Sequence, residues 1–179
     1  MKRPITFAVV AALVTVIAGP APAQKPGGVL RIYHRDSPAS MSIHEEGTNS
    51  TEIPMMGVFN NLVVYDQHIA QNSIGTIRPD LAESWSWSAD GKELTLKLRG
   101  GVKWHDGRPF AAADVKCTWD LMADKAPDKL RLNPRKSSYD NLEAVTANGD
   151  YEVTFRLKRP QPAFPMLLAG GFSVSILAT

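Results

Sequence analysis

Apolar and polar residues alternate most regularly in two neighbouring stretches of the chain, residues 84–88 and 94–99. Such a period of two is typical of β-strands with one buried face. The residues between the stretches include Asp90 and Gly91, which supply the backbone geometry of a tight turn. The pattern therefore predicts a β-hairpin. Its buried face would carry two tryptophans and three leucines, namely Trp85, Trp87, Leu94, Leu96 and Leu98.

A second hairpin is predicted around Asn148 and Gly149, between residues 142–147 and 151–157. Prolines after the second stretch end that strand, and residues 164–168 can begin a helix. Alternation in the second stretch places four apolar residues on one face, namely Tyr151, Val153, Phe155 and Leu157.

A helix is predicted downstream of the first hairpin. Val115, Trp119 and Met122 recur at helical spacing, and Asp114 lies in the first turn, at the positive end of the helix. Cys117 is the single cysteine of the chain, so no internal disulfide can form. Because Cys117 lies beside the apolar stripe, we expect a buried thiol.

Other elements are predicted on either side of these. A strand over residues 29–34 is followed by a polar loop over 35–47, and a helix starts at residues 49–51 with Pro54 in its first turn. Residues 124–138 are charged and are expected to form a solvated loop or loose helix. The apolar face of the earlier helix would consist of Met55, Met56, Val58, Phe59, Leu62 and Val63.

The first 23 residues have the pattern of a secretory signal peptide. Lys2 and Arg3 precede an apolar segment over residues 7–18, and Ala21-Pro22-Ala23 forms a cleavage pattern. The apolar segment is shorter than the ~20 residues that span a bilayer. We therefore expect cleavage after Ala23 and export to the periplasm of a bacterium.

The charge balance excludes two classes of partner. Removing Lys2 and Arg3 with the signal peptide leaves 18 of the 20 basic residues, against 18 acidic residues. A formally neutral chain offers no net attraction for nucleic acid or for an anionic membrane surface. We therefore expect neither as a partner.

The order of short motifs over residues 81–120 resembles one protein family. LAESW, DGK, alternating leucines, the run LRGGVKWHDGRPF and AADV follow one another in this stretch. This order resembles the signature region of the family 5 extracellular solute-binding proteins of ABC importers, which include dipeptide-, oligopeptide- and nickel-binding proteins. The chain departs from that pattern at Trp104, where relatives often have phenylalanine, and at Ala111, where they tend to have threonine. Losing a Ser or Thr cap costs about 1 kcal/mol unless another group caps the helix.

The resemblance implies an α/β fold of the class II periplasmic-binding-protein type. Residues 24–49 would begin the large ligand-binding lobe, residues 50–170 would form a small α/β subdomain with β-hairpins, and residues 171–179 would return to the large lobe. Relatives run to several hundred residues, so we interpret the chain as an N-terminal fragment. We expect the fragment alone to bind no solute with useful affinity, because a buried site needs walls that enclose most of the ligand.

The resemblance also implies a function. The protein would capture peptides or peptide-like solutes in the periplasm and deliver them to ABC permease subunits of the inner membrane. It would need no cofactor or metal, would not be an enzyme, and would be a monomer at full length. The loop after the first strand would face the ligand, since open α/β sheets bind ligands at the carboxyl ends of their strands. The expected ligand contacts are Ser40, Met41 and His44.

Two other functions remain open. His105 and Asp106 resemble half of a hydrolytic triad, as in a secreted hydrolase, although the Asp-Gly pair here favours a turn. An interaction module without a small ligand is the second alternative. His44, Glu45 and Glu46 suggest a metal or catalytic group, but they lack the i, i+4 histidines of zinc proteases, so a solvated acidic loop is favoured.

Overall fold

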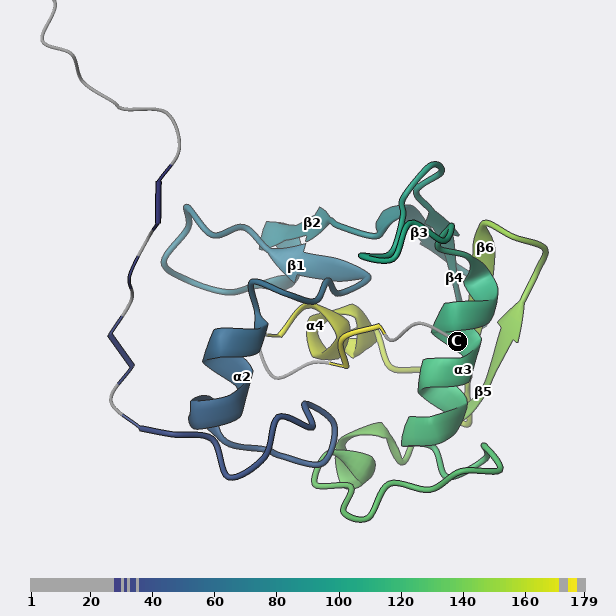
Figure 1. Ribbon diagram of the computed structural model, residues 1–179. Coiled ribbons are helices and arrows are strands. Elements are labelled where there is room, and N and C mark those ends of the chain that lie inside the picture. The colour runs from purple at the N-terminus through teal and green to yellow at the C-terminus, as the bar shows by residue number, and fades with distance from the viewer. Residues whose placement is uncertain (1–27, 30, 32, 35, 171–173, 177–179) are drawn as a thin grey trace, which may run out of the picture. The chain divides into compact units, whose positions relative to one another are not determined.

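The computed structural model describes residues 28, 29, 31, 33, 34, 36–170 and 174–176 of the 179-residue chain. The chain divides into two units, and all but the first few described residues belong to the unit His34–Thr179. The predicted signal peptide and most of the segment predicted to return to the large lobe lie outside the described residues. Figure 1 shows the helices and strands of the second unit.

Both β-hairpins predicted from alternation are confirmed. β3 (Ala82–Trp87) pairs with β4 (Glu93–Leu98) in an antiparallel hairpin. β5 (Leu142–Ala147) pairs with β6 (Glu152–Leu157) in the same way. The turn between β3 and β4 contains Gly91 at a φ of +67°, the left-handed conformation that glycine adopts without strain.

The apolar faces of the hairpins are also confirmed, with one exception. Trp85 and Trp87 are half-buried at the margin of the core. Tyr151 was predicted to be buried but is 47% exposed, because β6 begins one residue later and Tyr151 lies in the turn. The remaining predicted residues are all buried: Leu94, Leu96, Leu98, Val153, Phe155 and Leu157.

The hairpins join into one antiparallel sheet in the order β3-β4-β6-β5 (Figure 1). At the join, Thr95 lies opposite Thr154, and their hydroxyl oxygens are 3.0 Å apart. The two central strands read Glu-Leu-Thr-Leu-Lys-Leu and Glu-Val-Thr-Phe-Arg-Leu, so their antiparallel pairing is symmetric about these threonines. Glu93 accordingly meets Arg156 in an ion pair of 2.8 Å. The two hairpins thus repeat one pattern about an approximate twofold axis.

Both outer strands of this sheet carry a bulge. The pairing of β3 with β4 shifts register around Glu83, and the pairing of β5 with β6 shifts around Glu143. Both glutamates are exposed. A bulge leaves one residue of the strand unpaired and increases the local twist.

α3 (Ala112–Met122) packs on the apolar face of the sheet and contacts β5 and β6 (Figure 1). The predicted stripe is confirmed, since Val115, Trp119 and Met122 are buried. The Trp119 ring meets the rings of Phe155 and Tyr139 edge to face, at centroid distances of 5.1 and 4.8 Å. Such aromatic pairs stabilise a core by about 0.5–1.5 kcal/mol beyond the area that they bury.

The prediction of a buried thiol in α3 is wrong. Cys117 is exposed, while Val115 and Trp119 on either side of it are buried. Successive residues of an α-helix are rotated by about 100° around its axis. Cys117 is two positions from each neighbour of the stripe and therefore lies on the opposite face of the helix.

The start of α3 is held by half of a capping box. The Ala111 N–H donates to the Asp114 carboxylate at 2.9 Å, and Trp104 Nε1 donates to the same carboxylate at 3.1 Å. The alanine side chain cannot accept the hydrogen bond that a serine or threonine would take from the third helical residue. Only one of the two hydrogen bonds of a capping box is therefore present.

Ala111→Ser should complete this box and raise the free energy of unfolding by about 1 kcal/mol. Ala111 already has the extended backbone of a capping residue, with φ −144° and ψ 169°. Urea denaturation followed by tryptophan fluorescence measures the change. Ala113→Ser is the matched control, because Ala113 lies inside the first turn and is exposed. An equal gain in both variants would argue against capping as the cause.

α2 (Asn49–Met55) is shorter than predicted, and its buried side is polar. Pro54 lies in the second turn, and the helix ends one residue later. The buried residues of the helix are Thr51 and Glu52, so the predicted Met and Phe stripe is wrong. Met56 and Val58, which would belong to that stripe, are exposed.

The end of that predicted stripe forms a strand instead. β1 (Val63–Tyr65) pairs antiparallel with β2 (Ile77–Pro79) in a small second sheet. α4 (Phe164–Ala169) packs on this pair, which confirms the helix predicted after the second hairpin. None of the helices in the described part of the chain is long and apolar enough to cross a membrane.

The strand predicted over residues 29–34 is absent at its described positions, Val29, Arg31, Tyr33 and His34. Val29 and Tyr33 are 87% and 88% exposed. A strand needs a neighbour for its backbone hydrogen bonds, and none of the described strands pairs with this segment.

Candidate functional site

A buried ion pair lies at the centre of the candidate site. The Glu52 carboxylate of α2 contacts the guanidinium of Arg135, and their side chains are only 3% and 7% exposed. Arg135 also donates from Nη1 to the main-chain oxygen of Ile43 at 3.0 Å. The pair therefore joins α2 to the loop over residues 40–47. It also corrects the prediction of a solvated loop over residues 124–138, since Arg135 belongs to that segment.

His44 lies beside this ion pair and is also buried, with 2% of its surface exposed. Burial and the nearby Arg135 charge lower the pKa of His44 to about 4, and the backbone of Ser175 opposes this shift. The imidazole is therefore neutral at pH 7. The prediction of a solvated acidic loop is wrong for this residue.

Glu45 holds the same loop from the other side. Its carboxylate accepts the Arg131 N–H at 2.5 Å and lies 3.7 Å from Arg131 Nε. Within the described residues, no group of three or more His, Cys, Asp or Glu side chains could hold a metal ion. Glu45 therefore joins this loop to the segment that contains Arg131.

An open cleft of about 370 Å³ adjoins the buried pair. Its walls come from the loop over residues 40–47, from α2 and the turn after it, from β1, and from residues 174–176. One side is polar: Asn60 Nδ2 and the Asn61 N–H donate to the Asp80 carboxylate at 3.0 and 3.1 Å, and Ser175 Oγ donates to Asn61 Oδ1 at 3.2 Å. The lining residues are Ile43, Glu52, Met56, Phe59, Asn60, Asn61, Val64, Gln67, Asp80 and Ser175.

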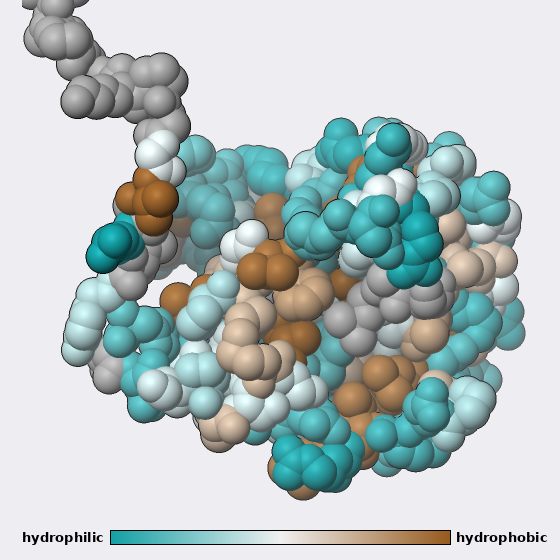
Figure 2. All heavy atoms as spheres, in the orientation of Figure 1, coloured by the Kyte–Doolittle hydropathy of each residue, from teal (hydrophilic) through white to brown (hydrophobic). Residues whose placement is uncertain are grey.

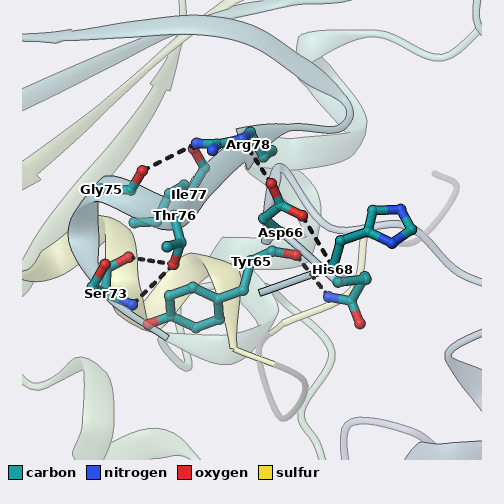
Figure 3. A network of polar contacts seen from close by, with 9 residues as sticks. Tyr65, Asp66, His68, Ser73, Gly75, Thr76, Ile77 and Arg78 are labelled. Atoms are coloured by element: carbon teal, nitrogen blue, oxygen red, sulfur yellow. Dashed lines mark hydrogen bonds and ion pairs between the residues drawn. The ribbon is translucent and has the colours of Figure 1, made fainter. Parts of the chain in front are cut away.

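The loop between β1 and β2 borders the cleft through Gln67 and is ordered by its own polar contacts (Figure 3). Arg78 Nε lies 3.3 Å from Asp66 Oδ2, and the His68 N–H donates to Asp66 Oδ1 at 3.0 Å. The short 3₁₀ helix Ile74–Thr76 closes the loop. Gln67 Nε2 donates to the main-chain oxygen of Tyr65 at 2.7 Å. The side-chain oxygen of Gln67 remains available as an acceptor.

The three predicted ligand contacts lie in different environments. Met41 is 62% exposed, Ser40 is half-buried and accepts the Ser42 N–H at 3.0 Å, and His44 is buried. Only Ile43 of this loop lines the cleft. Ligand contact by Ser40, Met41 and His44 therefore stays a prediction.

Sequence reasoning did not single out Asn60, Asn61 or Asp80. A signal for the first two was present, since two adjacent amides interrupt the otherwise apolar run over residues 58–64. Asp80 precedes the LAESW motif and drew no interpretation beyond its place in the chain.

His105 and Asp106 form a turn. The Asp106 carboxylate accepts hydrogen bonds from the Arg108 N–H at 3.0 Å and from Arg108 Nε at 2.7 Å, and these bonds lower its pKa below the usual value. Gly107 adopts a φ of +88°, as a tight turn requires. The turn is closed by a bridge between Lys103 and Pro109. This geometry explains the motif without a catalytic role.

The chain is similar to proteins of one family. Residues 76–176, more than half of the chain, match the model of bacterial extracellular solute-binding proteins, family 5 Middle. Glutathione-binding protein GsiB of Escherichia coli K12 is 40% identical over 89 residues, which cover 50% of this chain and 17% of the relative. Di/tripeptide-binding protein 2 of Pseudomonas aeruginosa UCBPP-PA14 is 36% identical over 116 residues, covering 58% of this chain and 22% of the relative.

A solved structure agrees with this relationship. The crystal structure of NikA from Brucella suis in complex with Fe(III)-EDTA matches 79% of this chain with a TM-score of 0.64 and 27% identity, and the match covers 26% of NikA. The chain thus spans about a fifth of the length of the two relatives above and matches about a quarter of this structure. Members of the matched family bind solutes and are not enzymes. The chain belongs to the family 5 bacterial extracellular solute-binding proteins.

Proposed function

We propose that this chain is part of the periplasmic solute-binding component of an ABC importer that captures peptides or peptide-like solutes. The family match over residues 76–176 carries the proposal. Two similar proteins are named for glutathione and for di- and tripeptides, and all of these solutes contain amide-linked amino acids. The permease subunits of the importer would be the protein partners.

The arrangement of the cleft supports this function. Ile43 and Ser175 are far apart in the sequence but line the same cleft. Such a meeting is expected if residues 24–49 and 171–179 belong to one lobe and residues 50–170 to another. Binding proteins with two lobes close around a solute about a hinge. In this proposal the loop over residues 40–47, fixed by Arg135, forms part of one wall.

A chimera tests the function. Residues 34–176 would replace the corresponding segment of the Pseudomonas di/tripeptide-binding protein, and calorimetry would measure binding of a dipeptide and a tripeptide. We expect saturable binding by the chimera and at most weak binding by the chain alone, because its cleft is open. A chimera that folds, judged by circular dichroism and cooperative melting, but binds no peptide would contradict the proposal.

The same chimera tests the predicted ligand loop. Met41→Ala should weaken peptide binding about fivefold or more, because Met41 is exposed and free to cover a solute. Ile74→Ala is the matched control, since Ile74 is an exposed apolar residue of the loop between β1 and β2. Equal affinities for both variants and the parent chimera would remove Met41 from the site.

A further inference from the structure

We propose that Asn148 is a modification site, at which intramolecular deamidation converts the side-chain amide to a carboxylate and thereby weakens the second hairpin. Asn148 and Gly149 lie in the turn between β5 and β6, and both are exposed. In Figure 1 this turn lies at the upper right, and Figure 2 shows mostly hydrophilic groups along the same edge. The turn contributes no residue to the lining of the cleft, so the proposal is independent of solute binding.

The reaction requires only the backbone and water. The Gly149 nitrogen attacks Cγ of Asn148, so that a bond forms between these two atoms and the bond from Cγ to Nδ2 breaks. Nδ2 takes up the proton of the Gly149 N–H and leaves as ammonia, and a cyclic imide remains. Water then hydrolyses the imide. Cleavage at Cγ gives aspartate, and cleavage at the main-chain carbonyl carbon gives isoaspartate.

The backbone nitrogen of Gly149 is accessible for this attack. In the part of the chain that the structure describes, no acceptor takes the Gly149 N–H. A Cβ added to this glycine would meet no atom within 4 Å, so the space around it is open. Glycine itself has no Cβ that could obstruct the approach. The nucleophile is therefore neither bonded nor shielded.

Two other asparagines show the contrast. Asn72 is also exposed, but the N–H of the next residue, Ser73, donates to Thr76 Oγ1 at 2.9 Å. Asn133 is followed by Pro134, whose nitrogen carries no proton to release. Asn148 is the single asparagine of the chain that precedes a glycine. We therefore expect Asn148 to react first.

The side-chain amide of Asn148 fastens the turn to β6. Nδ2 donates to Thr154 Oγ1 at 2.8 Å and to Glu152 Oε1 at 3.2 Å. The side chain must leave these acceptors before Cγ can reach the Gly149 nitrogen. The reaction therefore follows a local opening of the turn, which costs less free energy than global unfolding.

The product cannot restore these contacts. A carboxylate at position 148 is an acceptor without donors, so it cannot bond to the carboxylate of Glu152. Like charges at opposed positions of two strands are destabilising. Asp150 adds another acidic residue to the same turn, and its main-chain oxygen accepts the Ala112 N–H of α3 at 2.8 Å. Modification should therefore loosen both the hairpin and the start of α3.

Peptide mapping by mass spectrometry tests the proposal on the unmodified chain. The chain is incubated at mildly alkaline pH in water enriched in oxygen-18, which labels each hydrolysed imide. We expect deamidation at Asn148 to be roughly tenfold or more faster than at Asn72, the internal control, because glycine leaves the attack unobstructed. Both aspartate and isoaspartate should form at Asn148. Equal rates at the two sites, or the absence of isoaspartate at Asn148, overturns the proposal.

Asn148→Asp reproduces the aspartate product and tests its consequence for the hairpin. We expect the melting temperature, measured by circular dichroism, to fall by about 2–4 °C. In a Glu152→Gln background the same substitution should cost less, because the opposing charge is gone, and the double-mutant cycle isolates this term. An unchanged melting temperature in Asn148→Asp, or an equal fall in both backgrounds, overturns the proposed weakening by charge.

Discussion

Arg135→Met should lower the free energy of unfolding by about 3–5 kcal/mol, because it leaves the carboxylate of Glu52 buried without its counter-charge. Both side chains of this pair are almost fully buried. The substitution also removes the hydrogen bond to the Ile43 oxygen, which fixes the loop over residues 40–47. Urea denaturation followed by tryptophan fluorescence measures the loss.

The exposed pair of Arg156 and Glu93 gives the matched control. Arg156→Met also breaks an arginine–carboxylate pair, with an N–O distance of 2.8 Å, but Arg156 is 59% exposed and Glu93 39%. Water replaces the partner there, so the expected cost is at most about 1 kcal/mol. Adding Glu52→Leu to the Arg135 variant should restore much of the stability, because no buried charge then remains. Similar small losses for both arginine variants would contradict the importance of the buried pair.

Acidification from pH 6.5 to pH 4 should lower the free energy of unfolding by roughly 3 kcal/mol through His44 alone. The pKa of His44 falls from 6.5 to about 4 in the folded protein. Between these values the unfolded chain binds a proton that the folded chain does not, so stability falls as the pH falls. About one pH unit above 6.5, and about one unit below 4, this contribution levels off, because both states then bind the same number of protons.

Denaturation at several pH values, compared between the parent and His44→Gln, isolates this contribution. The groups in the surroundings of His44 are the Arg135 guanidinium, which is paired with Glu52, and the backbone of Ser175. Carboxylates with a lowered pKa, such as Asp90 and Asp106, titrate below this range and remain unchanged in the variant. A variant that retains the full slope between pH 6.5 and pH 4 would show that another group is responsible.

Local sequence patterns were sufficient to predict those elements whose signals lie within a few residues of one another. The alternation around Asp90 and Gly91 predicted the first hairpin, and the spacing of Val115 and Trp119 predicted α3. The pairing of β4 with β6 was not predicted, because its partners are 59 residues apart at Thr95 and Thr154. Nothing in either strand alone indicates which of several strands it will join.

The wrong predictions arose because a local sequence pattern does not determine tertiary contacts. The apolar residues after Pro54 were interpreted as one helix face, but a short apolar run does not distinguish a helix from a buried strand. Val63 belongs to β1, and α2 ends at Met55. Arg135 was taken as solvent-exposed because residues 124–138 are charged, and only its ion pair with Glu52 makes its burial tolerable.

The candidate site was predictable only in part. The loop around Ser40 and Met41 was chosen from its place after an expected strand and from the family resemblance. The cleft beside it depends on contacts between Asn60, Asp80 and Ser175, which are distant in the sequence. Tertiary packing brings these residues together. Sequence reasoning therefore identified the loop at one border of the cleft but did not identify its polar residues.

The bulges at Glu83 and Glu143 have a consequence for the behaviour of the protein in solution. An open antiparallel sheet exposes unpaired backbone groups along its two outer strands, and these groups can recruit a strand from another molecule. Here the hydrogen-bonding pattern is interrupted at one point in each outer strand. An exposed glutamate stands at each interruption, and Glu83 lies 4.0 Å from Arg99 Nη1, so a second copy approaching edge to edge meets charged side chains. The sheet thereby discourages the growth of fibrils from its open sides while remaining a four-stranded ribbon.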